Sequence, residues 1–329
     1  MTVLVTGGAG YIGSHMVLEL IRKDYDVVII DSLEKGHEES IKKSKLYVGN
    51  LRDGKLLDKV FTENKIDGVI HFAAYSLVGE SVKNPSIYYE NNIESTRVLL
   101  DAMIRHDCFK IVFSSSAAVY GSPTTDLIGE DELTNPTNTY GETKLVMEKM
   151  MKRYEIAYGL KYVALRYFNA AGADLSGEIG EVHNPESHLI PLVLDVALGK
   201  REKINIFGGD YETKDGTCIR DYIHVTDLCS AHLLALQYLN NHRESNVFNL
   251  GNGVGYSVLE VVDMVERVTN IPIEREIVEK RDGDPPVLVA SSQKAKEILG
   301  WCPKYNELEK IIETAWSFKK NYPNGYKEK

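Results

Sequence analysis

The sequence has little of what marks a secreted, membrane-bound or nucleic-acid-binding protein. Only four of its 329 residues are cysteine, and these show neither a CxxC pair nor the spacing of a zinc site. They therefore predict reduced thiols, no metal site and a cytoplasmic location. No apolar run approaches the length of a membrane span, and the first residues have the pattern of a strand rather than of a targeting segment. The net charge of −10 disfavours a nucleic acid or a membrane surface as a partner.

The start of the chain combines a strand, a glycine turn and a helix. Residues 3–5 form a short apolar run typical of a strand buried on both faces, and residues 11–21 have the pattern of a helix. Gly7 suits the tight turn, Gly10 lets a pyrophosphate approach the backbone, and Gly13 lets helix and strand pack closely. Free N–H groups at the helix N-terminus favour phosphates. The segment therefore predicts a dinucleotide site rather than a βαβ unit without a ligand.

Asp31, at the end of the next predicted strand (residues 26–31), distinguishes between nicotinamide cofactors. A carboxylate accepts hydrogen bonds from free ribose hydroxyls but repels a 2′-phosphate, and no arginine follows within residues 32–36. NAD is therefore favoured over NADP. The three-and-three spacing of the glycines resembles that of the extended branch of the short-chain dehydrogenase/reductase superfamily.

Strand and helix patterns alternate through the first half of the chain. The alternation predicts an α/β fold, with a Rossmann-type doubly wound parallel sheet and a smaller C-terminal α/β substrate lobe. A late strand at 246–251 is expected to return to the sheet. We expect a cofactor-binding domain of residues 1–168 plus about 225–250, and a substrate-binding domain of residues 169–224 plus 251–329. The predicted strands are 46–48, 68–74, 110–116 and 161–166, and the predicted helices are 55–63, 88–106 and 139–158.

Other residues have structural interpretations. Ser257 and Glu260 form a capping box that predicts the start of a helix used for packing. His224 and His232 stand in apolar surroundings and are expected in the core rather than as ligands. The polar tail, residues 319–329, is expected to be solvated.

Tyr140 and Lys144 form a YxxxK pattern on the predicted helix 139–158. The spacing of four places both side chains on one face, one turn apart. A phenol is a poor base at neutral pH, but a neighbouring ammonium stabilises the phenolate. Taken alone, the pattern is common on helices, where the tyrosine usually packs against other side chains and the lysine is usually solvated. Behind an NAD site it predicts a catalytic base with its lysine, and Ser116 at a strand end is the natural third member.

Five stretches resemble the UDP-glucose 4-epimerase family of the extended short-chain dehydrogenase/reductases, and the resemblance covers essentially the whole chain. The stretches are GGAGYIGSH at 7–15, HFAAYSLVGES at 71–81, FSSSAAVYG at 113–121, RYFN at 166–169 and IFGGDYETKDGTCIRDYIHV at 206–225. The last of these is highly specific.

This resemblance implies an NAD-dependent isomerase that interconverts UDP-galactose and UDP-glucose. Hydride leaves C4 for a tightly held NAD, and it returns to the opposite face of a 4-keto intermediate. Tyr140 is implied as the base, assisted by Ser116 and Lys144. A homodimer and a UDP-sugar partner are also implied.

The resemblance further implies two sets of binding residues. The implied NAD site contains Gly7, Gly10, Tyr11, Ile12, Gly13, Asp31, Asn50, Leu51, Phe72, Ala73, Ala74, Asn91, Ser114, Tyr140, Lys144 and Phe168. The implied substrate site contains Ser116, Asn169, His188, Leu189, Phe207, Arg220, Arg281, Asp284 and Leu288. By chemistry, two arginines suit a pyrophosphate, although Arg220 taken alone would fit a surface ion pair equally well.

The chain also departs from the family. Asn50 replaces an aspartate, Ser76 a lysine and His188 an asparagine found in many members, which bears on affinity. Leu288 stands where some members have a tyrosine, so UDP-N-acetyl sugars are possible further substrates.

Other functions were weighed. A sister 4-epimerase acting on UDP-xylose or UDP-glucuronate remains open, and an NAD-sensing protein without activity is a more remote alternative. A nucleotide-sugar 4,6-dehydratase is disfavoured, because Ala117 and Ala118 follow Ser116 where that reaction needs an acidic pair.

Overall fold

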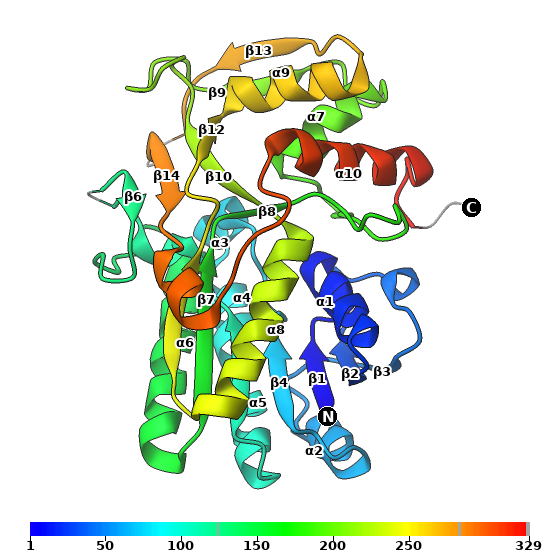
Figure 1. The fold of residues 1–329 in the computed structure, drawn as a ribbon, viewed down its shortest axis with the longest axis vertical. Helices are drawn as coiled ribbons and strands as arrows, with labels where there is room; N and C mark the ends of the chain where they lie inside the picture. Colours follow the sequence, from blue (N-terminus) through cyan, green and yellow to red (C-terminus); the bar gives the residue numbers. More distant parts are fainter. Residues whose placement is uncertain (124, 282–283, 327–329) are drawn as a thin grey trace.

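The structure, a computed structural model, describes residues 1–123, 125–281 and 284–326. Its central feature is a parallel sheet of seven strands in the order β11-β7-β5-β4-β1-β2-β3. The strands are β1(Thr2–Thr6), β2(Asp26–Asp31), β3(Lys45–Val48), β4(Gly68–His71), β5(Lys110–Ser114), β7(Lys161–Tyr167) and β11(Asn246–Leu250). Their C-terminal ends point toward a smaller part of the molecule, shown at the top of Figure 1.

The strands alternate side chains between two cores, which explains their apolar sequences. Val3 and Val5 belong to a core that also contains residues of α1(Tyr11–Arg22) and α8(Val225–His242), two helices that lie side by side (Figure 1). Leu4, between them, belongs to the core on the other face. That core takes side chains from α2(Gly54–Glu63), α5(Ser95–Arg105) and α6(Thr139–Tyr158). Helices therefore cover both faces, as the sequence predicts.

The order of the strands fixes where a ligand can bind. From β1 the chain builds β2 and β3 on one side, then crosses to β4, β5 and β7 on the other. Such a reversal opens a crevice at the carboxyl ends of the strands on either side of it. Gly7 directly follows β1, Asp31 ends β2, and Phe72 directly follows β4. The residues predicted for the cofactor therefore meet at one edge.

In the part of the chain that the structure describes, the smaller part contains two sheets and three helices. One sheet has the order β12-β10-β14-β6, with β8 also pairing with β10, and the other pairs β13 with β9. These strands are β6(Leu127–Ile128), β8(Asn169–Ala171), β9(Ile204–Phe207), β10(Ile219–His224), β12(Gly255–Ser257), β13(Arg275–Val278) and β14(Val287–Ala290). The helices α7(Leu189–Ala197), α9(Val258–Thr269) and α10(Leu308–Asn321) share one apolar core with residues of β8, β9, β10 and β12.

Most predicted elements are present, and their ends differ in informative ways. The predicted strand 68–74 ends at His71 and the strand 110–116 at Ser114, because the chain turns away there to form the site. The predicted helix 88–106 is preceded by a short helix and continues through a π-helical turn before α5. The shorter elements are η1(Glu38–Ser40), α3(Val78–Lys83), α4(Pro85–Tyr88), η2(Tyr89–Glu94), η3(Ala117–Tyr120) and η4(Ala295–Leu299).

The expectation of a solvated tail is wrong for Tyr326. Its side chain is buried, and its hydroxyl both accepts from the Gly180 N–H and donates to the Gly180 carbonyl, each at 3.0 Å. Lys319 is still part of α10. Residues 327–329 lie outside the described residues.

The structural interpretations of Ser257 and of the two histidines are confirmed. Ser257 and Glu260 form both hydrogen bonds of a capping box at the start of α9. His224 and His232 are completely buried. All four cysteines are unpaired, and three of them are buried. Among the described residues, no helix combines the length and apolar character needed to cross a membrane.

Candidate active site

The glycine turn after β1 is shaped by close packing on one side and open space on the other. Gly7 has φ +71°, and a Cβ there would lie 2.7 Å from the Ala73 backbone nitrogen. A Cβ at Gly13 would collide with the Gly7 carbonyl oxygen. At Gly10, the N-cap of α1, a Cβ would meet only that oxygen among the described residues, at 3.4 Å. Gly10 thus leaves the start of the helix open, as a bound pyrophosphate requires.

Asp31 lies beside this turn and is tied to it. One carboxylate oxygen accepts from the Ala9 N–H and the other from the Leu33 N–H, both at 2.9 Å. Burial raises the pKa of Asp31, while these two N–H donors act to lower it. The carboxylate is therefore held rigidly at the turn, with lone pairs left to accept from ribose hydroxyls. The residues present fit an NAD adenosine.

Other residues predicted for the cofactor surround this crevice. The Phe72 ring lies 4.8 Å from the His232 ring, centre to centre. Asn50 accepts from the Arg52 N–H at 3.0 Å. The Tyr11 side chain, in contrast, turns away and donates to the Gly172 carbonyl at 2.7 Å. Its backbone N–H, in the first turn of α1, is what remains for a phosphate.

Tyr140, Lys144 and Ser116 are brought together where β5 ends and α6 begins. Asn138 caps α6 by accepting from the Gly141 N–H at 2.9 Å, which places Tyr140 in the first turn. The Nζ atom of Lys144 lies 5.8 Å from the centre of the Tyr140 ring. It also donates to the Ser114 carbonyl at 2.7 Å. Ser116 is buried and caps η3 by accepting from the Ala118 N–H at 3.1 Å.

Burial sets the protonation of this group. Burial lowers the pKa of Lys144 to about 7, although the nearby charge of Glu148 opposes the shift. Burial also raises the pKa of Tyr140, and hydrogen bonding with Ser116 works in the opposite direction. Without its cofactor the site therefore holds a protonated phenol beside an ammonium that gives up its proton easily. Added positive charge near Tyr140 would favour the phenolate.

A buried ion pair behind Lys144 was missed by the sequence analysis. Glu148 and Arg166 are both buried, with a closest distance of 2.6 Å, and the Ser115 hydroxyl donates to Glu148 at 2.5 Å. Arg166 also donates to the Tyr120 hydroxyl at 2.9 Å. The one sign of this pair in the sequence was that Glu148 lies one helical turn after Lys144, on the same face of α6.

The residues predicted for the UDP moiety lie on the smaller part. Arg220 on β10 donates to the Asp284 carboxylate at 2.5 Å, so this pair is formed in the structure. The Arg281 guanidinium lies 4.0 Å from the centre of the Phe207 ring. This stacking suits a position where a base or phosphate approaches.

The other predicted substrate residues lie on or beside β8, α7 and β14 of the smaller part. Asn169 on β8 donates to the Asp221 carbonyl at 3.1 Å. Leu189 is the first residue of α7, and His188 directly precedes it. Leu288 on β14 is paired in register with Arg220, and it packs with Phe168 on one small apolar cluster.

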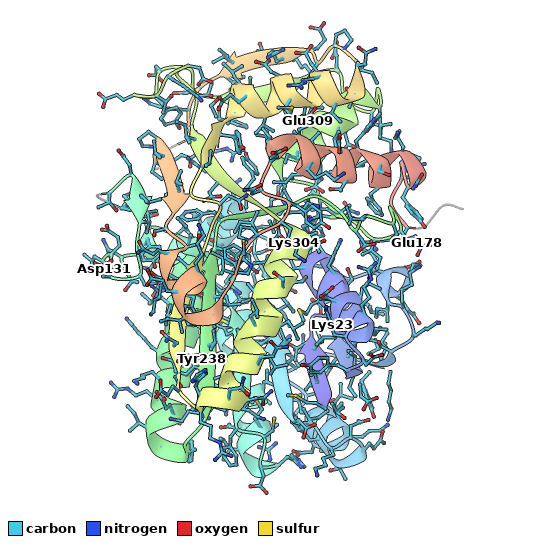
Figure 2. All side chains as sticks on the ribbon, in the orientation of Figure 1. Lys23, Asp131, Glu178, Tyr238, Lys304 and Glu309 are labelled. Carbon is cyan, nitrogen blue, oxygen red and sulfur yellow. The ribbon has the colours of Figure 1, made fainter. Side chains whose placement is uncertain are left out.

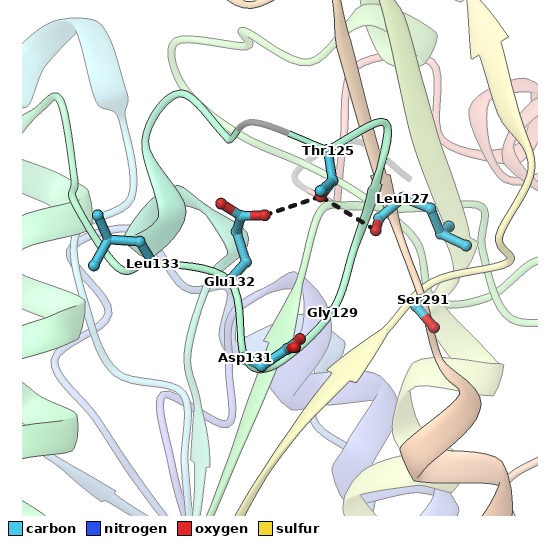
Figure 3. Close-up of a pocket in the computed structure, with 7 residues that line it drawn as sticks. All are labelled: Thr125, Leu127, Gly129, Asp131, Glu132, Leu133 and Ser291. Atoms are coloured by element: carbon cyan, nitrogen blue, oxygen red, sulfur yellow. Dashed lines mark hydrogen bonds between the residues drawn. The ribbon is translucent and has the colours of Figure 1, made fainter.

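A pocket of about 360 Å³ lies elsewhere, beside β6 and β14 (Figure 3). Thr125 crosses one side of it and donates to Glu132 at 2.9 Å. Figure 2 places Asp131 at the outer edge of the molecule. None of the predicted site residues lines this pocket, and its small size suits neither a dinucleotide nor a UDP-sugar. Its lining residues are Thr125, Leu127, Gly129, Asp131, Glu132, Leu133 and Ser291.

A glycine turn before a helix, an acid that ends β2, and a tyrosine and its lysine beside the end of β5 define an extended short-chain dehydrogenase/reductase. The family model described as the NAD dependent epimerase/dehydratase family matches residues 3–251. The UDP-glucose 4-epimerase of Halalkalibacterium halodurans is 58% identical over 326 residues, which cover 99% of this chain and 98% of that protein. That of Lacticaseibacillus casei is 50% identical over 327 residues, covering 99% of each. The chain belongs to the UDP-glucose 4-epimerase family.

Solved structures agree with this assignment. A crystal structure of a UDP-glucose 4-epimerase is 55% identical, with a TM-score of 0.98 and complete coverage of both chains. The UDP-glucose 4-epimerase of Bifidobacterium longum, solved in complex with NAD+ and UDP, is 41% identical with a TM-score of 0.94. That match covers 99% of this chain and all of the other. The predicted fold class is therefore confirmed.

Proposed function

We infer that this protein is an NAD-dependent isomerase that interconverts UDP-galactose and UDP-glucose. The observation that carries this inference is the meeting of Tyr140, Lys144 and Ser116 at the sheet edge that also holds the glycine turn and Asp31. Such an arrangement places a proton acceptor beside a dinucleotide site. When bound there, NAD supplies an acceptor for the C4 hydride, and it is also the donor that returns it.

Tyr140 acts as the general base in this proposal. Its phenolate takes the proton of the sugar 4-hydroxyl as C4 is oxidised, and the phenol returns a proton when C4 is reduced. The Lys144 ammonium stabilises the phenolate, because it lies beside the ring and points at the same strand end. The Ser116 hydroxyl donates to the reacting oxygen, which lowers the cost of the developing charge.

The charge of Glu148 favours the protonated form of Lys144. A carboxylate held in an ion pair with Arg166 adds negative potential near the lysine, and this potential opposes its loss of a proton in a buried site.

The remaining predicted residues hold the two nucleotides. For the cofactor these are the glycines 7, 10 and 13 with Asp31, which fixes the adenosine, and the side chains around the crevice. For the substrate, Arg220 and Arg281 carry positive charge toward a pyrophosphate, and Asp284 accepts from a ribose hydroxyl. Arg220 is already paired with Asp284, so its guanidinium is oriented before the substrate arrives. A UDP moiety held at a distance from C4 leaves the sugar free to present either face.

The domain division follows from the same reasoning. We assign NAD binding to residues 1–168 with about 225–250, and UDP-sugar binding to residues 169–224 with 251–329. The return of β11 to the large sheet supports this division, as does the packing of α8 on that sheet. One short strand, β6, departs from it by pairing with β14.

We propose further that the protein works in the cytoplasm as a homodimer, without a nucleic-acid partner. The unpaired cysteines support a reducing compartment, and the net charge of −10 argues against nucleic acid. The dimer rests on membership of the family alone. Light scattering on the eluted peak of a sizing column tests it, and a mass of one chain would contradict it.

The activity is tested with UDP-galactose in an assay coupled to UDP-glucose oxidation. Steady formation of UDP-glucose is expected without added reductant. UDP-xylose and UDP-glucuronate are measured in parallel, because a sister epimerase would turn over one of these faster. Tyr140→Phe serves as the inactive control that excludes a contaminating epimerase.

A further inference from the structure

The segment between β8 and α7 carries a regular set of metal-ligand residues that the sequence analysis did not assign. Glu181, His183, Glu186 and His188 follow one another at intervals of two, three and two residues. One donor atom from each lies within 4.8 Å of all the others. The sequence analysis expected no metal, because it looked for cysteine spacing.

The four side chains converge on one point instead of forming two separate ion pairs. The Nδ1 atom of His183 lies 3.2 Å from a Glu181 oxygen and 3.6 Å from a Glu186 oxygen. The Nδ1 atom of His188 contacts that same Glu181 oxygen. The two imidazole rings stand 5.2 Å apart, centre to centre, at 83° to each other. Both histidines therefore turn Nδ1 toward the same Glu181 oxygen, and the four donor atoms form one group.

Burial gives this centre a protected side and an open side. The Glu181 side chain is 7% exposed, and that of His188 is 50% exposed. Glu186 is held by backbone N–H groups of Ser187 and His188, at 2.8 and 3.0 Å. Two ligands are therefore fixed from within, and an ion has a path of entry past His188.

We propose that Glu181, His183, Glu186 and His188 bind one zinc ion. Zinc binds imidazole nitrogen and carboxylate oxygen at about 2.0–2.2 Å, so donors of a tetrahedral site lie roughly 3.3–3.5 Å apart. The 3.2 and 3.6 Å separations of His183 from the two carboxylates are close to that spacing. His188 lies nearer to Glu181 than two zinc ligands can, and the donors spread over as much as 4.8 Å, so binding requires the His188 ring to move back from the carboxylate. Mixed nitrogen and oxygen donors favour zinc over calcium or magnesium. Four protein ligands complete the coordination sphere, which is typical of a structural site rather than a catalytic one.

The ion would fix this segment against the nucleotide-binding turn. His183 packs edge-on against Tyr11, with the ring centres 6.2 Å apart. The Val182 carbonyl contacts the His37 ring nitrogen at 3.2 Å, and the segment ends where Leu189 begins α7. Loss of zinc should therefore raise the KM for the UDP-sugar more than it lowers kcat. This consequence rests on the proposed function, whereas zinc binding itself does not.

The test begins with elemental analysis of untagged protein dialysed into metal-free buffer, where about one zinc per chain is expected. Chelator-stripped protein should melt at a lower temperature and should recover on addition of zinc chloride alone. His188→Asn and Glu186→Gln, both at partly exposed positions, should lose most of the zinc and all of the recovery. His106→Asn is the matched control, because it removes a histidine that pairs with a carboxylate, Asp58, outside the segment.

The outcomes separate the zinc site from the proposed activity. Protein that folds and epimerises UDP-galactose but neither retains nor responds to zinc would overturn the site. Zinc retained equally by the His188 and Glu186 variants would also overturn it, since the ion would then lie elsewhere. Zinc lost in these variants but kept in the control supports the site, whether or not the protein epimerises UDP-galactose.

Discussion

The ammonium nitrogen of Lys144 lies 5.8 Å from the centre of the Tyr140 ring, and burial lowers the lysine pKa to about 7. The two residues share one face of α6, and the Ser114 carbonyl holds the lysine from the sheet. Burial raises the pKa of Tyr140 and lowers that of Lys144, so it disfavours the charged form of both groups. The first two predictions follow from this pair.

Tyr140→Phe removes the proposed base and keeps the ring. We expect kcat to fall by about 10²–10⁴, the usual contribution of a positioned acid–base group. The fold and bound NAD should be unchanged, because the change keeps the ring and removes only a hydroxyl that hydrogen-bonds with Ser116. Steady-state or stopped-time assays with UDP-galactose measure the decrease in kcat. Tyr89→Phe, which removes an exposed hydroxyl that donates to Glu142, is the control. A near-normal kcat in Tyr140→Phe would remove it from the mechanism.

Lys144→Met keeps the aliphatic stem and removes the charge. Without the cation, the Tyr140 phenolate is less stable and its pKa rises. Activity that depends on the phenolate should then appear at higher pH than in the native enzyme. Profiles of kcat and of kcat/KM against pH measure this displacement. Lys149→Met, exposed on the same helix, should leave the profile in place. An unchanged profile in Lys144→Met would mean that the lysine serves only to bind cofactor.

Local patterns in the sequence were sufficient to predict the elements and the proximity of the three residues proposed as catalytic. Gly7 packs against the Ala73 backbone and Gly13 against the Gly7 carbonyl oxygen, so neither position has room for a side chain. Few other residues could therefore form this turn. The spacing of Tyr140 and Lys144 lies within one helix, so it survives any error in the tertiary arrangement. Ser116 follows because parallel strands end at a common edge.

Partners distant in sequence could not be predicted in this way. Tyr326 pairs with Gly180 across 146 residues, and no periodicity records that contact. In the sequence, nothing distinguishes Arg166 from other residues of its strand, but in the structure it is buried in an ion pair with Glu148. The convergence of Glu181 and His188 depends on the path of an irregular segment, which apolar patterning leaves undetermined.

Asp31→Ala should weaken NAD binding to cofactor-stripped protein by about 1.5–3 kcal/mol, because it removes hydrogen bonds to a charged acceptor. The same change removes the repulsion of a 2′-phosphate, so NADP should lose less affinity or gain some. Calorimetric titration with both dinucleotides measures the two effects. Asp26→Ala, at the exposed start of the same strand, is the matched control. Equal NAD affinity in Asp31→Ala and native protein would contradict the assignment.

Stability should decrease in mild acid. Burial lowers the pKa of His71 and of His224 to about 3 and that of His232 to about 4. Burial lowers the pKa of His15 as well. As the pH falls below 6.5, the unfolded chain therefore binds at least about three protons that the folded chain does not bind. Asp221 offsets one of them, because burial raises its pKa to about 7 and it is already protonated when folded.

The unfolded chain then binds at least about two more protons than the folded chain, so the free energy of unfolding should fall by roughly 2.7 kcal/mol or more per pH unit between pH 6 and 5. Urea titrations of the same preparation at pH 7, 6 and 5 measure this slope. Stability that stays level over this range would show that the histidines are protonated in the folded protein.

Leu288→Tyr tests whether this position limits the size of the sugar. Leu288 and Phe168 pack against the same small apolar cluster, and Leu288 is paired in register with Arg220, so it is near residues proposed for both NAD and UDP. Leucine lacks the ring and hydroxyl that some family members place here, which should leave room for an N-acetyl group at C2. We therefore expect the native enzyme to turn over UDP-N-acetylglucosamine alongside UDP-glucose.

Overpacking a formed site costs about 1–3 kcal/mol, so the tyrosine in Leu288→Tyr should depress kcat/KM for the N-acetyl sugar by roughly 5- to 150-fold. Val287→Tyr puts the same ring on the opposite face of β14 and should not discriminate between the sugars. If both substrates decline together in Leu288→Tyr, or the native enzyme ignores the N-acetyl sugar, the residue does not control substrate size.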